Sequence, residues 1–199
     1  MLRYGKWILA AALVSISADN AIAKDCTFED CSYSNATCYL LAGPRWCQLA
    51  TGGPYGHYTP VNAYNHTSYT AINTSWNDWN YPPAGQATNS LYITTDNVNN
   101  YNHDIDYDRV SNSGVAWWGY TTYSNTGSCL NRGSAHIQMN GYYIDGNTSR
   151  QLITAIHETG HAIGLGHVCT CAAAMVPCLN CGLSNLAPCD AQGANALYH

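Results

Sequence analysis

The residues best suited to do chemistry in this chain lie together between positions 157 and 167, where the sequence reads HETGHAIGLGH. His157 and His161 are four residues apart, so on a helix both imidazoles project from the same face. Two neutral imidazole nitrogens at that spacing can bind one Zn²⁺ at about 2.0–2.1 Å. Gly164 allows the chain to turn sharply, which brings His167 back as a third ligand. Three protein ligands leave one coordination position for water, and this is typical of a catalytic zinc rather than a structural one.

Glu158 adds an acid–base group beside the first of these ligands. A carboxylate there can take a proton from a water that Zn²⁺ activates and pass it to a leaving amine. Two other interpretations are a buried amphipathic helix with incidental histidines and a zinc-binding domain without activity. The motif HExxHxxGxxH fixes both the ligands and Glu158, and this favours hydrolysis of peptide bonds over either alternative.

A helix must present these ligands, and the sequence predicts one that starts at Asn147 or Thr148. Either residue can cap the helix through its side-chain oxygen, and Gly164 can end it by taking a positive φ. The other predicted elements are strands over 57–62, 90–95, 104–110, 114–120 and 135–139, a helix over 68–79, and a C-terminal helix over 188–198.

The composition limits the class of protein. The chain has 199 residues, which is enough for one domain, and its 46% hydrophobic content supports a packed core. Only 10% of the residues are charged, whereas an average domain carries about 25%. The formal net charge is -5 and no basic run is present, so the sequence excludes a nucleic-acid-binding protein.

The first residues predict export. Arg3 and Lys6 precede an apolar stretch over 7–16, which is too short to span a bilayer, and Ala21-Ile22-Ala23 fits a cleavage site. We therefore expect a signal peptide at 1–23 and a secreted, extracellular or periplasmic protein with no stable membrane association.

The ten cysteines suggest disulfides formed in an oxidising compartment. Four of them fall in residues 24–56, which we interpret as a Cys-rich N-terminal segment or a short prosegment, followed by a catalytic domain over 57–199. Cys47 is either part of a disulfide or a thiol that blocks the zinc.

The segment HETGHAIGLGH resembles the long zinc-binding signature of the metzincin metalloendopeptidases. Met175, within Ala174-Met175-Val176-Pro177, is similar to the family's Met-turn. Among the metzincins, the matrixins are the most similar, because Ala196-Leu197-Tyr198 and Asp190-Ala191-Gln192-Gly193 resemble their C-terminal helix.

The resemblance implies an α+β fold: a mixed five-stranded twisted sheet with a zinc-binding active-site helix and a C-terminal helix. Met175 would support the zinc site by packing and would not bind the metal. A substrate would bind in extended form along the edge strand by β-augmentation. The residues implied to contact substrate are Val115, Ala116 and Trp117 on this strand, and Val176 and Pro177 beside the pocket.

Matrixins often carry a second, structural zinc bound by a His-x-Asp pair and two further histidines. The segment 103–106 departs from that spacing and Trp117 replaces the histidine of the edge strand, so we expect only the catalytic zinc. The remaining histidines are then surface or core residues, namely His57, His66, His103, His136 and His199. Ca²⁺ is a possible second cofactor through Asp96, Asp104, Asp106 and Asp108, with a merely solvated acidic loop as the alternative.

These observations predict a monomeric, secreted, zinc-dependent endopeptidase that acts on protein or peptide substrates. The rival is a catalytically degenerate, disulfide-rich binding or structural protein on the same scaffold. Glu158 discriminates between them, because a scaffold that only binds zinc does not need this carboxylate.

Overall fold

The computed structural model describes residues 61–82, 91–95, 103–124, 135–168, 173–177 and 185–198, and the backbone of two short strands at 21–24 and 40–41. The apolar stretch of the predicted signal peptide, Cys47 and Asp96 lie outside the described residues. Cys189 is described and is disulfide-bonded, and the other cysteines lie outside the described part of the chain.

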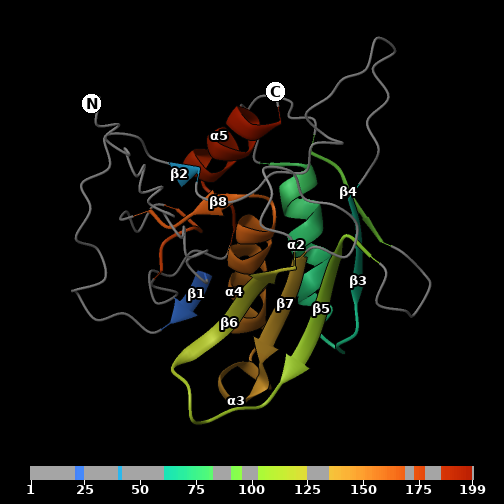
Figure 1. Cartoon of the computed structure of the whole chain (residues 1–199), viewed down its shortest axis with the longest axis vertical. Helices are drawn as coiled ribbons and strands as arrows, with labels where there is room; N and C mark the ends of the chain where they lie inside the picture. Colours follow the sequence, from blue (N-terminus) through green and yellow to red (C-terminus); the bar gives the residue numbers. More distant parts are fainter. Residues whose placement is uncertain are drawn as a thin grey trace, which may run out of the picture.

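One mixed sheet forms the centre of the fold, with its strands in the order β1-β6-β7-β5-β3-β4 (Figure 1). The strands are β1 (Ala21–Lys24), β3 (Val61–Asn65), β4 (Ile93–Thr95), β5 (Ile105–Val110), β6 (Trp117–Tyr123) and β7 (Ala135–Asn140). Neighbours among β4, β3, β5 and β7 are parallel, and β6 is antiparallel to β7. The strands from β6 to β4 are the predicted five-stranded mixed sheet, which confirms the α+β fold. β1 adds a further strand outside β6.

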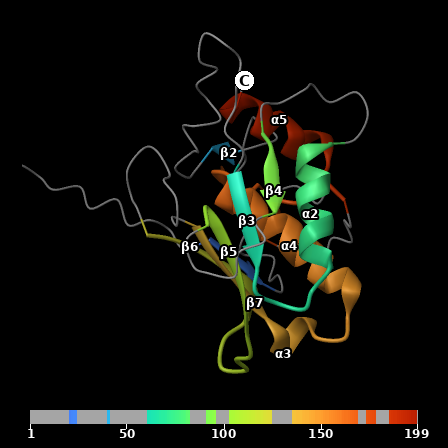
Figure 2. The ribbon, with the colours of Figure 1, turned by 90° about the vertical axis from the view of Figure 1, so that its right-hand side faces the viewer.

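Two helices, α2 (Ala71–Asn80) and α4 (Thr148–Ala162), pack side by side on one face of this sheet (Figure 2). The side chain of Tyr107 on β5 points toward them, since its hydroxyl lies 3.0 Å from Trp76 Nε1 and 2.7 Å from Thr159 Oγ1. Trp79 Nε1 donates to the carbonyl of Ile156 at 3.1 Å and fastens α2 to α4. Side chains alternate between the two faces of a strand, so the residues on either side of Tyr107 face away from the helices.

Most predicted elements are present, with shifted ends. β6 begins at Trp117 and not at Gly114, because Gly114 N–H donates to Asn112 Oδ1 at 2.8 Å in a turn. The first strand of the catalytic domain runs later than predicted, over Val61–Asn65, and residues 57–60 lie outside the described part. The sequence did not predict the short helix α3 (Gly141–Ile144), which follows β7 without a loop.

The C-terminal helix α5 (Pro188–Leu197) lies with its last residues at the C-terminal end of α4. Tyr198 O–H donates to the carbonyl of Ile163 at 2.6 Å, at the point where α4 ends. After that point the chain forms β8 (Leu165–Gly166), which pairs with β2 (Leu40–Leu41). Among the described residues, no helix has the length and apolar character that a bilayer crossing would demand.

Candidate metal centre

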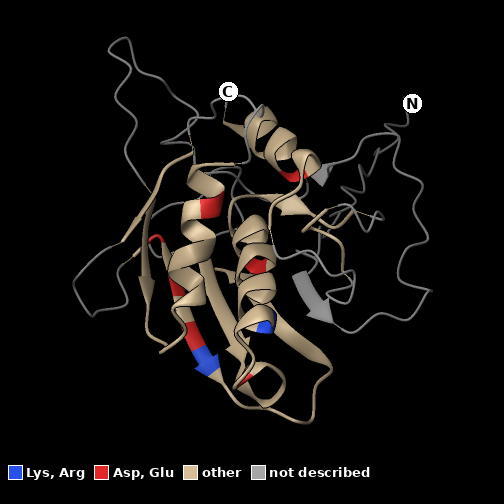
Figure 3. Cartoon of the chain, turned by 180° about the vertical axis from the view of Figure 1, so that it is seen from behind, with Lys and Arg blue, Asp and Glu red and all other residues tan. Residues whose placement is uncertain are grey.

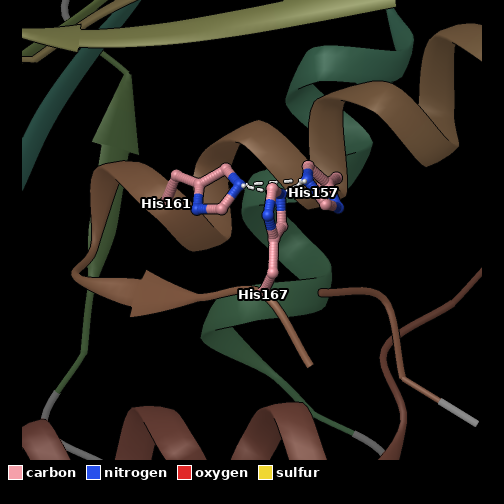
Figure 4. Close-up of side chains that lie close together, drawn as sticks. All are labelled: His157, His161 and His167. Atoms are coloured by element: carbon pink, nitrogen blue, oxygen red, sulfur yellow. Dashed lines mark hydrogen bonds between the residues drawn. The ribbon is translucent and has the colours of Figure 1, made fainter. Parts of the chain in front are cut away.

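The helix that carries the zinc motif has the predicted ends. Asn147 caps α4, since its side-chain oxygen accepts from Arg150 N–H at 3.0 Å. The helix ends at Ala162, and Gly164 takes a φ of 100°, a conformation that costs a glycine little. This turn reverses the chain, so that β8 leads His167 back toward the helix (Figure 4).

The three motif histidines converge with their ring tips together (Figure 4). His157 Nε2 and His161 Nε2 are 3.0 Å apart, and His167 Nε2 lies 3.2 Å from the first and 3.1 Å from the second. A tetrahedral Zn²⁺ with bonds of about 2.0–2.1 Å holds its ligand atoms about 3.3 Å apart. The three nitrogens therefore have nearly the separations that one such ion imposes.

The protons on these rings show why a cation fits between them. His157 Nδ1 lies 2.8 Å from the carbonyl of Ala174, and His161 Nδ1 lies 2.8 Å from the carbonyl of Leu165. A carbonyl only accepts, so both rings carry their proton on Nδ1 and present bare lone pairs at Nε2. Two lone pairs 3.0 Å apart repel each other and form no hydrogen bond, whereas a shared metal ion turns this repulsion into two bonds.

Burial keeps the two helix-borne ligands neutral. Burial, and to a lesser degree the neighbouring His167, lower the pKa of His157 to about 3, against the Ala174 carbonyl that raises it. The pKa of His161 is lowered well below its ordinary value by burial and by the two other histidines. A neutral imidazole is the form that binds a metal, so these rings are ready to bind at neutral pH.

The turn around Met175 supports His157 from below. Asp190 on α5 accepts from Ala174 N–H at 2.7 Å and from Met175 N–H at 3.2 Å. This fixes the Ala174 carbonyl that receives the His157 proton. Burial raises the pKa of Asp190, and the backbone N–H donors of Ala174, Ala187 and Met175 lower it. Residue spacing does not connect Asp190 to His157, and the only signal for Asp190 in the sequence is the similarity to the C-terminal helix of the family.

Met175 packs directly beneath the zinc-motif helix. It is 2% exposed, and a Cβ added to Gly160 would lie 2.1 Å from its sulfur. Gly160 therefore lets the thioether approach the helix between the turns that carry His157 and His161. Val176 and Pro177, which follow in the same turn, are also buried.

The side chain of Glu158 extends from α4 toward β6. It is fully buried, and Oε2 accepts from Thr121 Oγ1 at 2.6 Å. A Cβ at Gly119 would lie 2.6 Å from Glu158 Cγ, so only a glycine on β6 permits this close approach. The structure thus adds Thr121 and Gly119, both on β6, as residues that position Glu158 and that the sequence did not identify.

β6, which was expected to be the edge strand, pairs on its outer side with the extended segment β1. Gly119 lies opposite Ala23, Tyr120 opposite Ile22 and Thr121 opposite Ala21, in antiparallel register. Of the residues predicted to contact substrate, Trp117 lies opposite Lys24, while Val115 and Ala116 precede the strand. The Val115 carbonyl accepts from the Tyr143 hydroxyl at 2.6 Å.

The carboxylates predicted as calcium ligands contact separate groups where they are described. Asp104 Oδ2 accepts from Asn62 N–H at 2.8 Å, Asp106 Oδ1 lies 2.8 Å from His66 and from His103, and Asp108 Oδ2 lies 2.7 Å from His136. His103 is buried, the side chain of His66 is 8% exposed, and His136 is partly exposed. Calcium binding stays a prediction.

The comparison with known families fits this geometry. The family model for matrixins matches residues 88–199. The chain is a matrixin. Matrixins are zinc-dependent metalloproteases, and in this matrixin His157, His161 and His167 are arranged so that they could hold the metal. No curated protein matches the chain.

Proposed function

We propose that this matrixin is a secreted zinc-dependent endopeptidase whose metal ligands are His157, His161 and His167. The convergence of their Nε2 atoms at 3.0–3.2 Å, with two of the protons held on the opposite ring nitrogens, carries the proposal. Bound zinc would supply a water of lowered pKa, near 7, and would polarise the carbonyl of the scissile bond. Met175 supports the ligands by packing under α4.

Glu158 is the proposed general base and then general acid. It follows the first ligand on α4, and its second oxygen is held by Thr121 on the edge strand. A carboxylate fixed at one oxygen keeps the other in a defined direction. It accepts the proton of the attacking water and then donates it to the nitrogen of the departing amine, so that the proton lost in the first step is used in the second.

The substrate is proposed to lie along β6 as an added antiparallel strand. β1 supports this, because its four residues pair with β6 in that direction and lie next to α4. Backbone pairing gives affinity for any extended peptide, and side-chain pockets give specificity. Trp117 would contact the substrate on this strand, with Val115 and Ala116 just before it, and Val176 and Pro177 would wall the neighbouring pocket.

The proposed signal peptide overlaps β1. Cleavage of a signal peptide after Ala23 would remove three of the four residues of β1, which spans Ala21–Lys24. The edge of β6 would then be available to a substrate only after export. The mature protein would consist of residues 24–56 and a catalytic domain over 57–199, acting as a monomer on proteins or peptides, without nucleic-acid partners.

Comparison of the wild-type protein with Glu158→Gln on an unfolded protein substrate tests the proposal. The amide keeps the volume of the side chain but cannot take the proton, so we expect a loss of kcat/KM of about 10²–10⁴-fold with unchanged zinc content. Thr122→Ser, on the same strand but outside this contact, is the matched control and should keep full activity. A wild-type protein that binds zinc and cleaves nothing would overturn the proposal and would leave the degenerate binding scaffold.

A further inference from the structure

A second group of metal-binding side chains lies on the opposite face of the sheet from α4. His66 follows β3, His103 precedes β5, and Asp106 lies within β5. β3 and β5 are parallel neighbours with Tyr64 opposite Asp106, so the end of one strand and the start of the other meet here. Asp106 precedes Tyr107, which faces the helices, and its carboxylate therefore faces away from them.

The three side chains converge on one point. Asp106 Oδ1 lies 2.8 Å from His66 Nε2 and 2.8 Å from His103 Nδ1. One ligand atom from each residue lies within 4.8 Å of the other two. The cluster is shielded from solvent, with side-chain exposures of 8% for His66, 0% for His103 and 7% for Asp106.

The surroundings favour a positive ion. Asp106 and Asp108 lie on one face of β5 and Asp104 immediately precedes the strand, and the whole chain has only 12 acidic residues. Figure 3 shows the acidic positions along this strand. Tyr64 stacks on the ring of His103 at 4.8 Å between centroids and tilts against His66 at 4.5 Å, which keeps both imidazoles in place.

We propose that His66, His103 and Asp106 form a second binding site for a divalent transition metal of the zinc type, which ties β3 to β5. Two imidazoles and one carboxylate are ligands that Zn²⁺ accepts, whereas Ca²⁺ takes six to eight oxygen ligands. The set differs from the His-x-Asp pair with two further histidines that matrixins often use, because His66 directly follows β3 and Asp106 stands three residues after His103. Under this proposal the protein binds two zinc ions, whereas the sequence predicted one.

Counting bound zinc in three forms of the full chain tests this site. Each protein is dialysed to equilibrium against buffered Zn²⁺, and the metal is measured by mass spectrometry. The wild-type protein should bind about two ions per chain at saturation, one at each histidine cluster. His66→Gln should bind about one, because glutamine can still donate a hydrogen bond to Asp106 but is a poor ligand for zinc.

His136→Gln is the matched control, since His136 also contacts a carboxylate of β5, Asp108, at 2.7 Å, but belongs to no three-ligand cluster. It should keep both ions. One ion per chain in the wild-type protein, or two in His66→Gln, overturns the proposal. If His66→Gln fails to fold, anomalous diffraction from wild-type crystals at the zinc edge decides: a peak between the three side chains supports the site, and its absence there overturns it.

The two sites are tested independently. His157→Ala removes a ligand of the first cluster only, so it should abolish peptidase activity and leave about one zinc ion per chain. An inactive wild-type protein with two bound ions would contradict the proposed function and leave the second site supported.

Discussion

The two histidine clusters of this matrixin lie on opposite sides of the same sheet and differ in what stands between their nitrogens. At the first, Ala174 and Leu165 hold the protons on the far side of the rings, so bare nitrogens face each other. At the second, the carboxylate of Asp106 already lies between the rings and accepts from both. The first cluster therefore needs a cation between its nitrogens, whereas hydrogen bonds already join the three groups of the second.

The comparison indicates that the convergence of ligand atoms does not by itself determine the affinity for zinc. A metal at the second cluster must replace the two hydrogen bonds that Asp106 accepts from the rings, whereas a metal at the first replaces only the repulsion between lone pairs. We therefore expect the first cluster to bind zinc more tightly than the second.

The largest expected effect that separates the clusters comes from Asp190→Asn. An amide cannot accept all three backbone N–H groups that Asp190 receives, so the turn carrying the Ala174 carbonyl loosens. Loss of such contacts behind a ligand costs about 10–100-fold in metal affinity. Competition with a zinc chelator should show this loss at the first cluster alone. Equal weakening of both clusters would mean that the substitution acts on the whole fold.

Thr121→Val should have a smaller effect, and only on chemistry. It removes the hydroxyl that holds Glu158 Oε2 at 2.6 Å, and we expect kcat to fall about tenfold, or ~1.4 kcal/mol. KM and the zinc content of both clusters should not change. Thr121→Ser should restore the rate, because it returns the hydroxyl; failure of this rescue would argue that Thr121 acts through packing.

The smallest effect is expected at an ion pair outside both clusters. Hydrogen bonds from Arg109 and Tyr69 hold the pKa of Asp145 below 3.8, so the pair stabilises the fold above that pH and the gain disappears as the pH falls through the lowered pKa. The Asp145 side chain is 43% exposed, so Asp145→Asn should cost less than about 1 kcal/mol at pH 7. Urea unfolding at pH 7 and at a pH acidic enough to protonate Asp145 in the folded protein checks this; an equal cost under both conditions would contradict it.

The sequence predicted the first cluster well and the second not at all, for one physical reason. His157, His161 and His167 are placed by a single helix and one glycine turn, and such local geometry follows from residue spacing. His66 and Asp106 are 40 residues apart and meet only because β3 and β5 pair in a particular register. Residue patterns predict that strands exist but leave their register open.

The same limit applies to the prediction of the fold from the sequence. The strands of the central sheet follow from β-favouring residues, whereas the pairing of β1 with β6 depends on a contact across the chain. Likewise, nothing in the spacing of residues connects Thr121 on β6 with Glu158 on α4, although their oxygens are 2.6 Å apart.

Zinc titration of the metal-free protein tests the central claim most directly. Zinc is removed with a chelator, which should abolish cleavage of an unfolded protein, and is then returned in steps while cleavage and bound metal are both measured. If the three Nε2 atoms hold the ion that peptidase activity requires, the rate recovers fully with the first, tighter zinc ion, and the second adds binding without activity. Cleavage by the metal-free protein, or recovery only with the second ion, would contradict the account.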